Sequence, residues 1–115
     1  KTLAHPACVD SIPTSANKED FVSMGAFAAR KARQVVGNAL RVVAIELLCG
    51  AQGLEFRGGL RAGLGVAAAH DAIREMVAAL AEDRPQTPDI ETISQMVRGG
   101  SLVRRVESVV GPLEP

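Results

Sequence analysis

Residues 42–51 read VVAIELLCGA, and this stretch decides the fold. Its only charged residue is Glu46, so a helix formed here is apolar almost all round. A helix of that kind is normally buried on every side. The run is too short to span a bilayer. We therefore expect it to lie in the interior of a packed protein.

The helical pattern extends from this stretch in both directions and predicts one long helix over residues 18–56. The apolar positions that keep helical spacing are Met24, Phe27, Ala28, Val35, Ala39, Val42, Val43 and Leu47. Such a helix spans about 50 Å, whereas a compact domain of this length is roughly 35 Å across. The helix should therefore need cover from more of the same polypeptide or from other subunits. The alternative is a break at Gly37 or Gly50 that folds the run into a hairpin.

The remaining segments predict an irregular loop, a linker and shorter helices. Pro6 and Pro13 disfavour helix in residues 1–17. Asn17 is a good N-cap for the long helix, which would place Glu19 and Asp20 in its first turn. Residues 57–65 form a glycine-rich linker. Residues 66–115 contain three shorter helices, which begin near Val66, at Thr87-Pro88 and at Ser101.

These elements predict an all-α chain of one domain, residues 1–115. The expected architecture is a long helix of a multi-helix bundle followed by shorter helices and preceded by an irregular loop. The chain is 47% hydrophobic, yet it has no Trp, no Tyr and three Phe. Small apolar side chains therefore build the core, which suits helices that pack closely.

Charge and cysteine content exclude several functions. Thirteen basic and thirteen acidic residues cancel, which offers no electrostatic case for binding nucleic acid or an anionic membrane. No signal peptide is visible. Cys8 and Cys49 lie far apart without CxxC spacing, so we expect free thiols and a cytoplasmic protein. Because the first residue is Lys1 rather than Met, we also expect a fragment or a processed piece.

The two histidines, Cys8 and the glycine-rich linker carry little chemical signal. His5 and His70 lack partners at metal-ligand spacing, so no metal site is expected and both are interpreted as solvated surface histidines. Asp71 follows His70, but neighbours on a helix point apart. Cys8 has no nearby base and is interpreted as an incidental thiol. The glycines of residues 58–65 lack the strand and the Lys-Ser/Thr of a phosphate loop.

Several blocks of sequence, in order and spacing, resemble one enzyme family. They are HPACVDSIPTSANKEDFVSMG (residues 5–25), then AARKA, AIELL, AQGLEFR and EDRPQTPDIE. Together they closely resemble the C-terminal part of histidine ammonia-lyases, within the aromatic amino acid lyase family. The resemblance covers nearly the whole chain.

The resemblance implies an almost entirely helical homotetramer with a central helix bundle and active sites assembled from several subunits. It implies conversion of L-histidine to urocanate and ammonia. The family's electrophile is a 4-methylideneimidazol-5-one group formed from an internal Ala-Ser-Gly. This chain contains neither Ala-Ser-Gly nor tyrosine. The cofactor is therefore expected only in the full-length enzyme, and the rest of the polypeptide is an expected partner.

The same resemblance assigns site residues. Glu19 matches the family's active-site glutamate, which faces the substrate imidazole, and is the predicted catalytic and substrate-binding residue. Lys18 is a second predicted substrate-binding residue, at a place where the family often has Gln. Phe21 stands where the family usually has His. Asp20 is interpreted as a cap or a partner of a neighbour. The loop scaffold comprises Ser11, Thr14, Ser15 and Asn17.

Two alternatives remain open beside a lyase segment. One is a helical self-association fragment without catalytic activity. The other is a lyase relative that acts on another amino acid, as Phe21 and Lys18 suggest. The chain alone is expected to self-associate and to release no ammonia from histidine.

Overall fold

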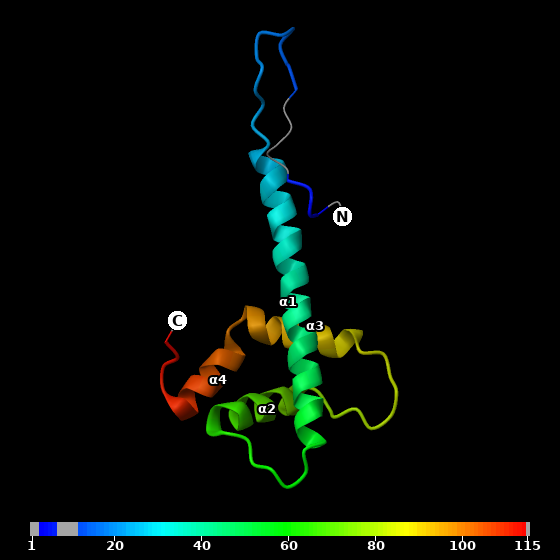
Figure 1. Cartoon of the computed structure of the whole chain (residues 1–115), viewed down its shortest axis with the longest axis vertical. Helices are drawn as coiled ribbons and strands as arrows, with labels where there is room; N and C mark the ends of the chain where they lie inside the picture. The colour runs from blue at the N-terminus through cyan, green and yellow to red at the C-terminus, as the bar shows by residue number, and fades with distance from the viewer. Residues whose placement is uncertain (1–2, 7–11, 115) are drawn as a thin grey trace. The chain divides into compact units, whose positions relative to one another are not determined.

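The computed structural model describes residues 3–6 and 12–114, and four α-helices without a named strand make up their regular structure (Figure 1). The helices are α1 (Gly25–Glu55), α2 (Leu64–Met76), α3 (Thr87–Arg98) and α4 (Ser101–Val110). This order confirms the predicted all-α class, with a long helix first and shorter helices after it. Contacts divide the chain into an N-terminal unit, residues 1–39, and a C-terminal unit, residues 40–115, with the boundary inside α1.

Helix α1 is one continuous helix of 31 residues. It runs through Gly37 and Gly50 without a break, which confirms the long helix and excludes the hairpin alternative. Each interior glycine costs about 1 kcal/mol relative to alanine. No proline interrupts residues 25–55, so nothing removes a backbone donor from the helical ladder.

The start of α1 differs from the prediction. The helix begins at Gly25 rather than near residue 18, and no acidic residue lies in its first turn. Ser15, Ala16 and Asn17 have φ values of 50°, 53° and 64°, and a right-handed helix cannot pass through such residues. Asn17 is therefore part of a turn and not an N-cap. The Ser23 hydroxyl instead accepts a hydrogen bond from the Gly25 amide at 3.4 Å.

The shorter helices also shift at their ends. Helix α2 ends at Met76 rather than near residue 81, because Val77 adopts an extended conformation and its side chain is buried. Thr87 is the first residue of α3, preceded by Gln86 at the N-cap, and Pro88 lies in the first turn, where its missing amide costs nothing. Helix α4 begins at Ser101 with Gly100 as its N-cap.

The core lies in the C-terminal unit, where residues of α2, α3 and α4 cluster with Ala44 and Ala51 of α1; the three short helices lie beside this part of α1 rather than around it (Figure 1). Its buried members are Ala44, Ala51, Ala72, Ile73, Val77, Ile93 and Leu102. The alanines among them fit the prediction of a core built from small side chains. Helix α2 packs chiefly against α4. A Cβ at Gly65 would lie 3.4 Å from the side chains of Val106 and Val110, which is an ordinary van der Waals distance and shows how close α2 and α4 lie at this point.

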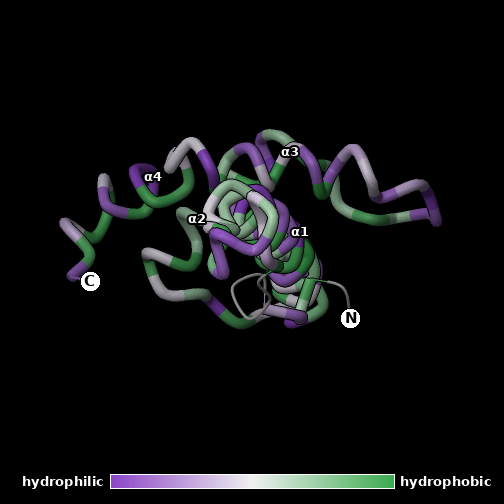
Figure 2. Tube along the Cα trace, turned by 90° about the horizontal axis from the view of Figure 1, so that it is seen from above, coloured by the Kyte–Doolittle hydropathy of each residue, from purple (hydrophilic) through white to green (hydrophobic). Residues whose placement is uncertain are grey.

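Much of the apolar surface of this chain stays exposed. Within residues 42–51 the side chains of Ala44 and Ala51 are buried, whereas Val42 is 57% exposed and Ile45 44%. Its own chain therefore does not bury this helix on every side. This agrees with the prediction, made from its length, that the helix needs cover from other protein. Figure 2 shows hydrophobic and hydrophilic residues alternating along α4, the pattern of an amphipathic helix with one face on the core.

Helix α1 is also long and apolar enough to cross a membrane. It contains an 18-residue window of mean hydropathy 1.4, of which 11% is buried. This window is longer than the ten-residue run considered from the sequence. A core helix of a larger soluble assembly has the same length and composition, so the criterion alone does not assign a membrane.

Candidate functional site

The predicted catalytic residue, Glu19, closes a tight turn in the N-terminal unit. Its backbone pairs with that of Thr14: the Thr14 amide donates to the Glu19 carbonyl at 2.8 Å, and the Glu19 amide donates to the Thr14 carbonyl at 3.2 Å. This pair forms an isolated antiparallel bridge around residues 15–18. The Thr14 hydroxyl also donates to Oε2 of Glu19 at 2.9 Å. The Glu19 side chain is exposed, and the hydrogen bond from Thr14 holds its carboxylate at the turn.

The other predicted residues of this segment lie around the same turn. Lys18 is exposed, and its amide donates to the Ser15 carbonyl at 3.2 Å. Phe21 is 72% exposed, which is unusual for a large aromatic ring. Asp20 precedes α1 and so does not cap its first turn. The predictions for Ser11 and Cys8 lie outside the described residues.

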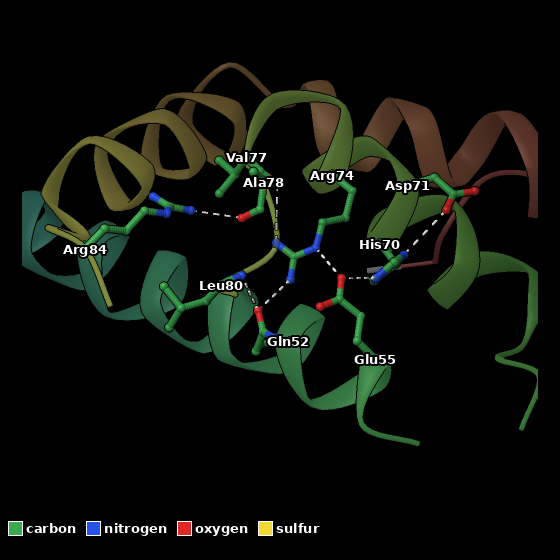
Figure 3. A network of polar contacts seen from close by, with 9 residues as sticks. All are labelled: Gln52, Glu55, His70, Asp71, Arg74, Val77, Ala78, Leu80 and Arg84. Carbon is green, nitrogen blue, oxygen red and sulfur yellow. Dashed lines mark hydrogen bonds and ion pairs between the residues drawn. The ribbon is translucent and has the colours of Figure 1, made fainter. Parts of the chain in front are cut away.

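A second polar cluster, which the sequence reasoning missed, joins the end of α1 to α2 (Figure 3). Arg74 of α2 donates through Nε to Oε1 of Glu55 at 2.6 Å and through a terminal nitrogen to Oε1 of Gln52 at 3.3 Å. The same Gln52 oxygen accepts the Leu80 amide at 2.8 Å. Gln52 and Glu55 are separated from Arg74 by about twenty residues, and no local sequence signal predicts such pairs.

Charge in this cluster stabilises the carboxylate form of Glu55. The hydrogen bond from Arg74 lowers the pKa of Glu55 from its ordinary value, and the charges of Arg74 and His70 act in the same direction. Burial opposes the shift by penalising the charged form. The cluster therefore contains an ion pair between Glu55 and Arg74 at neutral pH.

His70 belongs to this cluster, so its interpretation as a solvated histidine is wrong. Its side chain is 24% exposed, and its Nε2 lies 3.4 Å from Oε1 of Glu55. Its Nδ1 lies 3.5 Å from Oδ1 of Asp71, so these neighbours do meet despite their adjacent positions on the helix. His5, by contrast, is exposed as predicted. Among the described residues, no group of three or more His, Cys, Asp or Glu side chains is arranged to hold a metal ion.

Two apolar hollows lie in the C-terminal unit. One, of about 420 Å³, is bounded by α1 and residues 78–90, and its lining includes Cys49, Phe56 and Leu80. Cys49 is a free, exposed thiol. The other, of about 650 Å³, lies among α1, α2 and α4. Both hollows are lined mainly by carbon atoms and offer few polar groups to orient a small substrate.

The class of protein follows from the all-helical fold and from the sequence that surrounds the Glu19 turn. Residues 1–75 match the family described as aromatic amino acid lyase, and the chain belongs to this family. Over 99% of its length it is 61% identical to histidine ammonia-lyase of Symbiobacterium thermophilum, of which it spans 22%. It is 56% identical over 90% of its length to the histidine ammonia-lyase of Deinococcus radiodurans, of which it spans 20%.

Solved structures agree with this assignment. The crystal structure of histidine ammonia-lyase from Trypanosoma cruzi superposes with a TM-score of 0.85 at 39% identity, over 93% of this chain and 21% of that one. Tyrosine aminomutase from Streptomyces globisporus superposes with a TM-score of 0.82 at 31% identity, over 90% of this chain and 20% of that one. The chain thus spans about a fifth of the length of the relatives that it matches.

Proposed function

We propose that this chain is the C-terminal helical segment of a histidine ammonia-lyase, which converts L-histidine to urocanate and ammonia. The observation that carries the proposal is the 61% identity, over nearly the whole chain, to an enzyme of that name. The chain supplies one active-site carboxylate and part of the helical core. It is not active alone, and the rest of the lyase polypeptide is its first partner.

Glu19 is the residue of this chain that we assign to the substrate. A carboxylate is an acceptor for the N–H of an imidazole ring, and the bond is strengthened by charge when the ring is protonated. Such a carboxylate can also hold a proton from the ring while the amino group leaves. Lys18 lies next to Glu19, and we assign it to substrate binding as well.

The family's 4-methylideneimidazol-5-one group supplies the electrophile for the substrate amino group. The residues of this chain do not fit its formation, because the chain contains no Ala-Ser-Gly. It contains no tyrosine to act as the expected base either. The group and the base therefore belong to other parts of the full-length polypeptide.

The exposed apolar surface supports an oligomer. Val36, Val42 and Ile45 are 59%, 57% and 44% exposed on α1, and unpaired apolar surface of this kind marks a contact with other protein. We propose that a homotetramer in the cytoplasm covers it. The chain by itself should then self-associate, which light scattering would detect as a species larger than a monomer.

The test is an assay of the full-length protein with L-histidine, followed by the near-ultraviolet absorbance of urocanate. Glu19→Ala should lower turnover, because the ring loses its carboxylate partner. The 115-residue chain alone should produce no urocanate. A full-length protein that folds and assembles but does not deaminate histidine would contradict the proposal.

A second candidate function is a lyase or aminomutase that acts on another amino acid. The likeness to tyrosine aminomutase and the phenylalanine at position 21 favour it. Parallel assays with tyrosine and phenylalanine distinguish the two candidates, because each predicts turnover of a different substrate.

A further inference from the structure

The turn that carries Glu19 is closed by its own end residues. Two backbone hydrogen bonds, of 2.8 and 3.2 Å, join Thr14 to Glu19. Four residues separate the pair, and a third bond, from the Lys18 amide to the Ser15 carbonyl, tightens the turn at 3.2 Å. The two ends of the turn are thereby held in one register.

The backbone within the turn is strained. Ser15, Ala16 and Asn17 occupy the left-handed region in succession. Asn tolerates this region, whereas Ser and Ala pay a steric penalty there because of their Cβ atoms. Residues held in such conformations persist only where surrounding contacts over-determine them, and they gather at functional sites. The paired ends of the turn are the contacts that hold this strain.

The side chains at the two ends of the turn also meet. The hydroxyl of Thr14, which is half-buried, donates to Oε2 of Glu19 at 2.9 Å. A hydrogen bond to a carboxylate is charge-assisted and directional. It removes rotamers that a free glutamate would sample, and it engages one of the two carboxylate oxygens. The other oxygen, Oε1, is the one that we assign to a ligand.

We infer that Thr14 is a positioning residue, whose hydroxyl fixes the orientation of the Glu19 carboxylate toward substrate. This inference rests on the proposed function, since it needs Glu19 to act on the imidazole of histidine. The turn sets where the carboxylate lies, and the hydroxyl sets how it points. A carboxylate oriented before substrate arrives loses less freedom on binding.

The experiment uses the full-length protein and its kcat/KM for L-histidine. Thr14→Val keeps the shape of the side chain and removes the hydroxyl, and we expect a loss of about tenfold, since a hydrogen bond to a charged group is worth at least that factor. Thr14→Ser keeps the hydroxyl and should retain most of the activity. If Thr14→Val does not fold, Thr14→Ala removes the same hydroxyl with less bulk.

Two further variants separate positioning from folding. Thr92→Val is the matched control, because the Thr92 hydroxyl donates to a backbone carbonyl within α3 at 2.9 Å; its activity should stay within about twofold of the parent. The double variant Thr14→Val with Glu19→Ala should be no slower than Glu19→Ala alone, because Thr14 acts through Glu19.

Each outcome decides one claim. Loss of activity in Glu19→Ala with none in Thr14→Val overturns the role of Thr14 and leaves the proposed function standing. An equal loss from Thr14→Val in the presence and absence of Glu19 shows that Thr14 supports the fold, which also overturns it. Full activity of Glu19→Ala removes the basis of the inference. Absence of histidine turnover in the unmutated protein contradicts the proposed function itself.

Discussion

Replacement of Arg74 by methionine tests the polar cluster that joins α1 to α2. Arg74 is 14% exposed and reaches Glu55 at 2.6 Å, with further bonds to Gln52 at 3.3 Å and to the Val77 carbonyl at 3.4 Å. Methionine keeps the apolar stem of the side chain and removes every one of these donors. The end of α1 should then separate from α2 more easily.

The size of the effect follows from the contacts. A hydrogen bond to a charged partner contributes about 1.5–3 kcal/mol when both groups are well removed from water. The Glu55 side chain is 28% exposed, so water replaces part of what Arg74 supplied. Gln52 keeps its bond from the Leu80 amide. We therefore expect Arg74→Met to lower the local unfolding free energy by about 1–2 kcal/mol at pH 7.

The effect should depend on pH in a defined direction. The hydrogen bond from Arg74 lowers the pKa of Glu55 below its ordinary value of 4.5. A carboxyl group with a lowered pKa stabilises the fold above the unfolded value, and this contribution is lost as pH falls through the folded-state value. The difference between the parent and Arg74→Met should be largest at neutral pH and should shrink below about pH 4.5.

Backbone hydrogen exchange of the full-length protein, measured by mass spectrometry on peptides that cover residues 48–60, reports this local opening. Arg105→Met is the matched control, because Arg105 pairs with Glu75 at 3.0 Å with both side chains at least half exposed. The control should cost less than about 0.5 kcal/mol. Equal effects of the two substitutions, or an Arg74→Met effect that does not change with pH, would refute the reasoning.

Three further substitutions probe packing and backbone in the C-terminal unit. Ile93 is fully buried, so Ile93→Ala should lower the unfolding free energy by about 2–5 kcal/mol, seen as a lower Tm. The Ser94 hydroxyl is buried without a hydrogen-bond partner, so Ser94→Ala should raise stability by about 0.5–1 kcal/mol; a lower Tm would contradict this. Gly100 has a φ of +68°, and a Cβ there would lie 3.1 Å from the Arg104 side chain. Gly100→Ala should therefore lower the unfolding free energy by about 1–2 kcal/mol. Backbone hydrogen exchange should become faster at the residues where α3 meets α4.

The start of α1 could not be predicted from the capping preferences of single residues. Asn17, Glu19 and Asp20 are good residues for a helix N-terminus, and they predicted a start near residue 18. Asn is equally suited to a left-handed turn, and the structure uses it there. Two local signals compete in this segment, and the pairing of Thr14 with Glu19 decides between them. Neither Thr14 nor Glu19 carries a sequence signal that predicts this pairing.

The sequence by itself determined the all-α class, the long helix and its excess of apolar surface. These features depend on composition, on helical spacing and on the absence of proline, which act within a few residues along the chain. Only the tertiary structure decided that Ala44 is buried while Val42 stays exposed, and that Arg74 meets Glu55 and His70. Such choices depend on how helices distant in sequence pack against one another, and periodicity along one helix carries no information about its partner.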